Sequence, residues 1–305
     1  MIYTVTTSPS LDLILDLKDT LVSGGTYRAS HEEIRPGGKG INISIMLRHL
    51  GIPSTALGFV AVFSGDELMR LTAAEGIHTG FIRVRRGRTR VNLRLKDQSA
   101  ETRVNGLGPA VTSADLDYLL RKLNTLSAGD FLVLAGIVPP TLPQDIFVSF
   151  IHALEGKGVE VIVDSAPQYL FSVLELHPFL VKPGATELAA YLNLDLHDDN
   201  AVADALTLFH DKGARNVLLS LGSRGTWFMT EDGSRHFLKV EDQAPNLDRT
   251  GAGDSMIAGF LYDYLDTHNL KSAAAMAVAA GAATATSIGI ARAEDVLAQR
   301  QKVIF

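Results

Sequence analysis

The residues best suited to chemistry form a glycine-rich stretch at residues 249–254, RTGAGD, which leads into an apolar run. Glycines let backbone N–H groups converge on one point, and the run predicts a helix whose positive N-terminus attracts anions. Asp254 lies in the first turn of that helix, where a carboxylate is favoured. An anion site beside a carboxylate suits phosphoryl transfer to an alcohol, with Asp254 as the base. The alternative is a structural turn in which Asp254 only caps the helix.

A second glycine-rich stretch, PGGKGIN at residues 36–42, also precedes an apolar-periodic segment. It is not a Walker A loop, because Gly40 follows the lysine where that motif has serine or threonine. Gly37 and Gly38 let a ligand approach the backbone, while Lys39 supplies a cation and Asn42 a polar group one turn into the helix. Two such helix starts, one cationic and one anionic, suit the two ends of a bisubstrate site. The alternative for PGGKGIN is a helix start with a solvated lysine and no ligand.

Composition narrows the possible classes of protein. The chain has 305 residues, 46% hydrophobic content and a net charge of −6, so neither a nucleic-acid partner nor a membrane partner is expected. It contains no cysteine, which excludes disulfides, thiolate metal sites and a cysteine nucleophile. The uncharged tract at residues 272–291 is rich in small residues and predicts a closely packed buried helix. The first residues read as a strand and not as a signal peptide, so a cytoplasmic location is expected.

Strand-like and helix-like segments alternate along most of the chain, which predicts one α/β domain over residues 1–305 with a mostly parallel sheet covered on both faces. The predicted strands are Ile2–Thr7, Thr55–Phe59, Phe131–Ala135, Val159–Asp164, Phe179–Lys182 and Val217–Leu221. The predicted helices are Gly40–Leu50, Asp66–Ala74, Asp115–Leu123, Gln144–Glu155, Glu187–Leu192 and Ala201–Asp211. A hairpin is expected at residues 226–240, and from Ser255 onward the chain is expected to be helical.

Two segments with apolar/polar alternation, Leu11–Leu17 and Thr89–Leu95, interrupt this rhythm. Together with residues 28–35 and 101–105 they predict a small separate sheet with one exposed face. Over a cleft, such a sheet acts as a lid, formed by inserted segments at about residues 11–36 and 87–106. Its exposed face is a candidate homodimer surface.

With these motifs assembled, the chain resembles the ribokinase-like PfkB carbohydrate kinases over its whole length, and within them the bacterial 1-phosphofructokinase and tagatose-6-phosphate kinase branch. Further matches are residues 8–12, 87–92, 181–183 and 220–225. The resemblance implies a three-layer αβα sandwich with a small β-sheet lid. It also implies a kinase that uses ATP and Mg²⁺ and acts on a sugar phosphate. The Gly-x-Thr-Arg-x-Asn form at residues 87–92 favours fructose 1-phosphate, which would give fructose 1,6-bisphosphate.

The resemblance also assigns roles residue by residue. It makes Asp254 the catalytic base and Gly251, Ala252 and Gly253 the anion hole. Contacts to the sugar and its phosphate are expected from Asp12, Gly37, Gly38, Lys39, Asn42, Arg90, Asn92 and Asn105. Contacts to ATP are expected from Lys182, Ser220, Gly222, Ser223, Gly225, Gly251, Gly253 and Gly281, with Glu187 at the Mg²⁺ shell. The remaining arginines of the lid region are expected to form a solvated basic face: Arg83, Arg85, Arg86, Arg88 and Arg94.

Four departures from the family pattern keep other functions open. Ser8 stands where this branch usually has asparagine, and Ala61-Val62 replaces a glycine pair. Gly136-Ile137-Val138-Pro139 replaces the usual Gly-Ser-(Leu or Ile)-Pro, and Gly184 replaces the asparagine that acts with Glu187 on the Mg²⁺ shell. One alternative is a tagatose-6-phosphate kinase or another sugar kinase of the same fold. The other is a weakly active regulatory protein that binds a nucleotide or a sugar phosphate. Retention of Asp254 favours an enzyme, because a pure binding protein has no need of a base.

Overall fold

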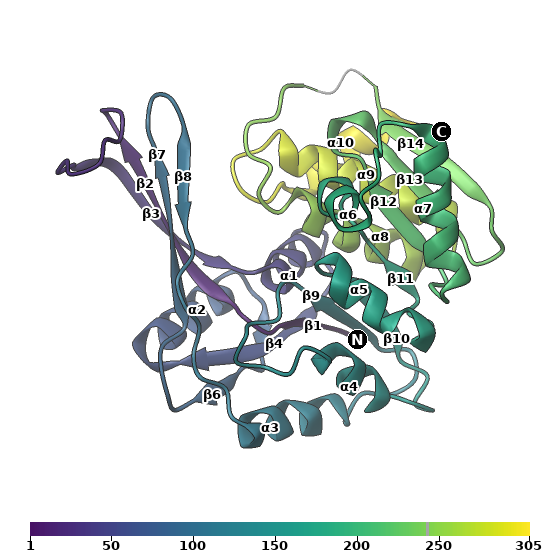
Figure 1. The fold of residues 1–305 in the computed structure, drawn as a ribbon, viewed down its shortest axis with the longest axis horizontal. Helices are drawn as coiled ribbons and strands as arrows, with labels where there is room; N and C mark the ends of the chain where they lie inside the picture. The colour runs from purple at the N-terminus through teal and green to yellow at the C-terminus, as the bar shows by residue number, and fades with distance from the viewer. Residues whose placement is uncertain (242–243) are drawn as a thin grey trace.

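The computed structural model describes residues 1–241 and 244–305. A large, mostly parallel sheet forms its centre (Figure 1), with the strand order β15-β14-β13-β12-β11-β10-β9-β1-β4-β5 and with β6 paired to β4. Its strands are β1 (Ile2–Thr6), β4 (Ser54–Ala61), β5 (His78–Thr79), β6 (Ile82–Val84), β9 (Phe131–Ala135), β10 (Glu160–Asp164), β11 (Leu180–Val181), β12 (Val217–Ser220), β13 (Thr226–Met229), β14 (Arg235–Val240) and β15 (Val303–Ile304). The pairs on the path from β12 to β15 are antiparallel and the others are parallel.

Helices cover both faces of this sheet. One face carries α3 (Ser113–Leu123), α4 (Ile146–His152), α5 (Pro167–Val173), α6 (Ala185–Leu192) and α7 (Asp199–Asp211). The other carries α1 (Lys39–His49), α8 (Ala252–Thr267), α9 (Leu270–Ala285) and α10 (Ala293–Arg300), with α2 (Val62–Ala74) packed beside α1. Two single-turn 3₁₀ helices, η1 (Leu174–Leu176) and η2 (Gly222–Arg224), complete the described elements. The three-layer αβα arrangement predicted from the alternation is confirmed.

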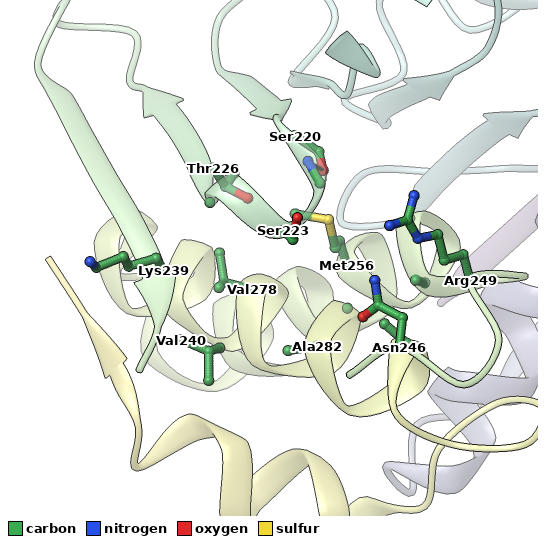
Figure 2. A pocket seen from close by; sticks show the side chains of 16 residues that line it. Ser220, Ser223, Thr226, Lys239, Val240, Asn246, Arg249, Met256, Val278 and Ala282 are labelled. Carbon is green, nitrogen blue, oxygen red and sulfur yellow. Dashed lines mark hydrogen bonds between the residues drawn. The ribbon is translucent and has the colours of Figure 1, made fainter. Parts of the chain in front are cut away.

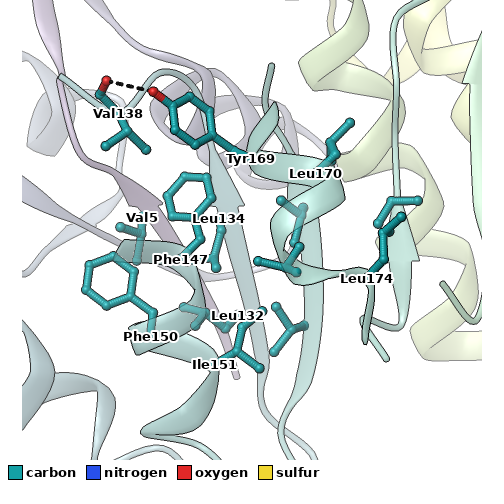
Figure 3. Packing of buried hydrophobic residues seen from close by; sticks show 14 of the residues in the cluster. Val5, Leu132, Leu134, Val138, Phe147, Phe150, Ile151, Tyr169, Leu170 and Leu174 are labelled. Carbon is teal, nitrogen blue, oxygen red and sulfur yellow. Dashed lines mark hydrogen bonds between the residues drawn. The ribbon is translucent and has the colours of Figure 1, made fainter. Parts of the chain in front are cut away.

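Strand β9 shows why the sheet needs two covering layers. Successive side chains of a strand point to opposite faces. Leu132 and Leu134 accordingly pack with α4 and α5, whereas Phe131 and Val133 pack with the helices of the opposite face. Figure 3 shows the first set beneath the aromatic rings of α4 and α5. A strand buried on both faces reads as a continuous apolar run, which is how β9 appears in the sequence.

The predicted small sheet is also present, with the order β3-β2-β7-β8. Its strands are β2 (Ser10–Leu17), β3 (Ala29–Gly37), β7 (Arg90–Lys96) and β8 (Glu101–Val104). It projects from the edge of the molecule in Figure 1. Strand β2 pairs parallel with β7, so the two inserted segments predicted from the sequence lie side by side. Its action as a lid stays a prediction.

The predicted elements are confirmed except at the C-terminus. The chain is not helical throughout from Ser255 onward, because Val303–Ile304 forms β15 against β14. A two-residue strand is too short to show any alternation, and only its partner strand reveals it. The tract at residues 272–291 does contain a buried helix, α9. Among the described residues, no helix is long and apolar enough to cross a membrane.

Candidate active site

The glycine turn at residues 249–254 positions Asp254 at the start of α8. Gly251 precedes the helix with φ 80°, a left-handed conformation that glycine adopts without strain. A Cβ at Gly251 would lie 2.3 Å from Cδ1 of Ile290, so this turn has no room for a side chain. Asp254 follows in the first turn of α8 and is buried. The first N–H groups of a helix lack acceptors within it, so this turn can receive an anion.

The glycine turn at residues 36–42 brings two further predicted residues to the same place. Gly38, with φ 122°, precedes α1, which begins at Lys39. Asn42, one turn into α1, donates a hydrogen bond from Nδ2 to Oδ2 of Asp254 over 2.8 Å. Gly37 lies behind Asp12, because a Cβ at Gly37 would be 2.5 Å from Oδ2 of that carboxylate. The two turns therefore meet at the carboxylate of Asp254.

Asp164 is a site residue that the sequence analysis did not single out. It ends β10 and is only 2% exposed. Its Oδ1 is 2.9 Å from Nζ of Lys39, and its Oδ2 is 3.3 Å from Nζ of Lys182. The signal that could have found it is its place at the carboxyl end of a predicted parallel strand, where open α/β sheets bind ligands. Asp164 fixes two lysines next to the anion site.

The charges in this cluster set its acid–base properties. Burial and the charge of Asp164 raise the pKa of Asp254 to about 6, although Lys39, Asn42 and Lys182 oppose the rise. Burial by itself would lower the pKa of Lys39, but the charges of Asp164 and Asp254 outweigh it and hold that pKa above its ordinary value. Burial likewise opposes ionisation of Asp164, and the two lysines nevertheless hold its pKa below the ordinary value. The cluster therefore contains two fixed cations and a carboxylate that accepts a proton near neutral pH.

The pocket predicted to receive the sugar, called the sugar-side pocket below, extends from Asp254 toward the small sheet. Nδ2 of Asn92 on β7 donates to Oδ1 of Asp12 on β2 over 2.8 Å, and the hydroxyl of Ser10 donates to the same oxygen over 2.8 Å. The pocket brings together most of the predicted sugar contacts, and its lining includes Asp12, Gly38, Lys39, Asn42, Arg90, Asn92, Gly251, Gly253 and Asp254. Two predicted contacts lie outside this lining: Gly37 and Asn105, of which Asn105 is exposed.

Arg90 is a cation of this pocket with unused donor capacity. Its Nε is buried and has no hydrogen-bond partner. Burial lowers the pKa of Arg90, and the charge of Asp12 opposes that change. A buried guanidinium without a partner on one donor is a receptive site for an anion. Arg103 on β8 and Arg249 line the same pocket, and the sequence analysis assigned neither to the sugar.

A second pocket holds the predicted nucleotide contacts (Figure 2). Ser220, Gly222, Ser223 and Gly225 line one side, after β12, and Gly281 of α9 lines the other. Figure 2 shows Val278 and Ala282 of the same helix facing into this space. Small side chains leave room for a flat ring. Gly281 has a packing role as well, because a Cβ there would be 2.7 Å from Cγ of Met256 on α8. Lys182 lies outside this lining and in the sugar-side pocket.

The residues expected near a metal lie between these pockets. Glu187 of α6 lines the sugar-side pocket, and its charge acts on Lys39. Oδ2 of Asp164 is buried, and Nζ of Lys182 lies 3.3 Å from it. A Cβ at Gly184 would meet no atom within 4 Å, so this position is open space. Among the described residues there is no group of three acidic or histidine side chains that could hold a metal. This set fits an ion that takes most of its ligands from phosphates and water, as Mg²⁺ does.

One prediction about the small sheet is wrong. Arg94 was expected on a solvated basic face, but only 8% of its side chain is exposed. It forms ion pairs with Glu101 of β8 and with Asp248, which immediately precedes the glycine turn at residues 249–254. Arg90, Asn92 and Arg94 alternate along β7 and share one face, on which Asn92 and Arg94 are buried. Sequence alternation could not show which face of β7 is covered, since the covering loop comes from a distant part of the chain.

Three comparisons place the chain among known proteins. The model of a family described as pfkB family carbohydrate kinase matches residues 6–296. A 1-phosphofructokinase of Bacillus subtilis is 34% identical, with 94% of this chain and 93% of that protein covered. A D-tagatose-1-phosphate kinase of Klebsiella oxytoca is 30% identical, with 99% of each covered. The structure of phosphofructokinase-2 from Escherichia coli in complex with substrates and products has a TM-score of 0.91 and 26% identity, with 98% of each chain covered.

Proposed function

Because the chain belongs to the pfkB family of carbohydrate kinases, we propose that it transfers the γ-phosphoryl group of ATP to the 6-hydroxyl of fructose 1-phosphate. The products are ADP and fructose 1,6-bisphosphate. The observation that carries the proposal is the position of Gly253, which lines both the sugar-side pocket and the nucleotide pocket. A phosphoryl group that passes from one bound substrate to the other must do so where the two pockets meet. Here they meet at Gly253, which belongs to the predicted anion hole.

Asp254 acts as the general base. Its pKa of about 6 leaves it ionised at neutral pH yet basic enough to accept the proton of the attacking hydroxyl. The hydrogen bond from Asn42 occupies Oδ2, which leaves Oδ1 for the substrate. Burial keeps competing water away from this oxygen.

Two lysines stabilise the charge that moves between the substrates. Lys39 and Lys182 are both held by Asp164, so they are in place before substrates bind. A Cβ at Gly253 would be 3.2 Å from Nζ of Lys182, which brings this ammonium group against the anion-hole turn. Preorganised donors of this kind supply a large share of catalysis in phosphoryl transfer. That Lys39 also contacts the sugar stays a prediction.

Arg90 receives the phosphate that the sugar already carries. Its unpartnered Nε points to an anion as the missing partner, and a guanidinium binds phosphate through two parallel hydrogen bonds. Asp12, held by Asn92 and Ser10, accepts hydrogen bonds from sugar hydroxyls. The substrate thus spans the pocket with its phosphate at Arg90 and its free 6-hydroxyl at Asp254.

Mg²⁺ is part of the proposal. Glu187 and Asp164 would hold its water shell, and the ion would neutralise charge on the ATP phosphates. Glu187 lies in the first turn of α6.

The experiment is an ADP-release assay over a panel of fructose 1-phosphate, fructose 6-phosphate, tagatose 1-phosphate, tagatose 6-phosphate and unphosphorylated fructose. We expect the highest kcat/KM with fructose 1-phosphate. A higher value with either tagatose phosphate would identify a tagatose-phosphate kinase. ADP release that no sugar stimulates would favour the regulatory binding protein.

We also propose a homodimer formed through the small sheet. Ile34 on β3 and Val104 on β8 are 45% and 51% exposed, which places apolar side chains on the open side of this sheet. Molar mass from light scattering tests the dimer, with Ile34→Glu as the variant expected to give a monomer. A wild-type mass of one chain at micromolar concentration would contradict it.

A further inference from the structure

The ion pair between Arg94 and Asp248 joins two parts of the molecule that are distant in sequence. Arg94 lies on β7 of the small sheet, and Asp248 lies in the loop before α8. Nη2 of Arg94 is 3.3 Å from both carboxylate oxygens of Asp248. The side chains are 8% and 11% exposed, so this pair is shielded from water and from salt. It is a buried connection between the small sheet and the main body.

Asp248 in turn holds the anion-hole turn. Its Oδ1 accepts a hydrogen bond from the backbone N–H of Thr250 over 2.9 Å, immediately before Gly251. Burial opposes ionisation of Asp248, but the Thr250 N–H and the charge of Arg94 together keep its pKa below the ordinary value. The chain from Arg94 through Asp248 to Thr250 ends one residue from the start of the anion hole.

Arg94 has a second partner that belongs to the small sheet itself. Its Nη2 is 3.0 Å from Oε2 of Glu101 on β8. Strands β7 and β8 are paired, so Arg94 and Glu101 move together when the small sheet moves. If the small sheet moved away from the loop, the pair with Asp248 would be lost and Glu101 would keep the guanidinium paired. This arrangement allows the connection to open without leaving an isolated charge on Arg94.

We propose that Arg94 is a positioning residue that fastens the small sheet to the anion-hole turn. Its ion pair with Asp248, already formed without substrate, ties the sheet to the loop before α8 and holds the Gly251–Gly253 turn in the geometry that receives the phosphoryl group. Arg90 and Asn92, on the same face of β7, contact the sugar side at the same time. Binding of the sugar phosphate and assembly of the anion hole are thereby linked through one strand.

The first test needs no substrate. Hydrogen–deuterium exchange is measured on the full chain for wild type, Arg94→Gln and the control Arg70→Gln, which removes an exposed arginine paired with Glu67 on α2. We expect Arg94→Gln to increase exchange both in residues 90–96 and in residues 248–254, and the control to change neither segment. Faster exchange in residues 90–96 alone would overturn the proposal, because the anion-hole turn would then be independent of Arg94.

The second test is kinetic and rests on the proposed function. We expect Arg94→Gln to lower kcat roughly 10- to 100-fold, the worth of a charge-assisted bond, with the KM for ATP nearly unchanged. Asp248→Asn removes the charge but keeps an acceptor for Thr250, so it should give a similar loss. The double variant should be no worse than the poorer single variant. If the fold losses of kcat in the two single variants multiplied in the double variant, Arg94 and Asp248 would act independently and the proposal would be overturned.

The variant Arg94→Lys distinguishes loss of the ion pairs from general damage to the fold. Lysine retains the charge but cannot contact Glu101 and Asp248 with a planar fork, so it should restore part of kcat. A Lys variant as impaired as Arg94→Gln, with wild-type exchange in both segments, would contradict the proposal. If the wild-type protein phosphorylates no sugar of the panel, the proposed function fails, while the exchange experiment still decides the role of Arg94.

Discussion

Asn42 donates a hydrogen bond to Asp254 over 2.8 Å, although the two residues are 212 positions apart in the chain. Each belongs to a different glycine turn at the start of a different helix, α1 or α8. The bond therefore joins the turn proposed to contact the sugar to the turn proposed to receive the phosphoryl group. It also fixes which carboxylate oxygen of Asp254 remains free for the substrate.

The first prediction concerns the base. Asp254→Asn should lower kcat by about 100-fold or more while ATP binding is retained, because an amide cannot accept the proton. ATP affinity is measured by calorimetry alongside turnover. Near-wild-type turnover in the variant would remove Asp254 from this role.

The same residue predicts a pH profile. The base works only when ionised, so kcat/KM should fall as the pH drops through about 6, the raised pKa of Asp254. Asn42→Ala removes a hydrogen bond that lowers this pKa, so the acidic limb should move to higher pH. An acidic limb that stays in place in Asn42→Ala would mean that another group is being titrated.

The third prediction concerns Arg90. Arg90→Ala should raise the KM for the sugar phosphate by roughly 10- to 100-fold and leave the KM for ATP nearly unchanged, since a charge-assisted bond to phosphate is lost at one end only. Arg83→Ala is the matched control, because its guanidinium is exposed and pairs with Asp66 on the surface. Equal increases in both KM values would refute a role confined to the sugar phosphate.

The fourth prediction concerns Gly184, which has φ −92° and ψ 134°, a conformation open to any residue. Its side-chain space is empty, so Gly184→Asn should fit and return an amide oxygen near the Mg²⁺ shell. We expect the Mg²⁺ concentration for half-maximal rate to fall roughly 10-fold. Gly184→Ala adds the Cβ without the oxygen and should leave the titration unchanged. An identical titration for the Asn variant would show that a different group already orders this shell.

The fifth prediction concerns Val62, which begins α2 with φ 46°. A β-branched residue is strained in this left-handed region, at a cost on the order of 1–3 kcal/mol. Val62→Gly should therefore raise the free energy of unfolding by about 1 kcal/mol, after the greater chain entropy of glycine is subtracted. Denaturant unfolding measures it, and Val62→Ala should fall between the two. A glycine variant less stable than wild type would contradict the strain.

The local chemistry was readable from the sequence alone. Gly251 and Gly38 indicate turns that glycine fits without strain. The alternation of strand-like and helix-like segments predicts the buried sheet and its covering helices. Asp254 and Lys39 could be chosen because each stands at the start of a predicted helix beside such a turn. These features depend on neighbours within a few residues, which is the range over which a sequence pattern carries physical information.

Tertiary structure decided the partners. Asp164 reads as the last residue of an ordinary strand, and only the fold places it between two lysines that come from other elements. Arg94 reads as one more surface arginine, and only the loop carrying Asp248 buries it. The sequence by itself determined the fold class and the two glycine turns, and it predicted Asp254 as the base. The charge pairs that hold their geometry form between different elements, and two of them, Lys39–Asp164 and Arg94–Asp248, join residues more than a hundred positions apart. Their energies depend on burial that no local pattern reports.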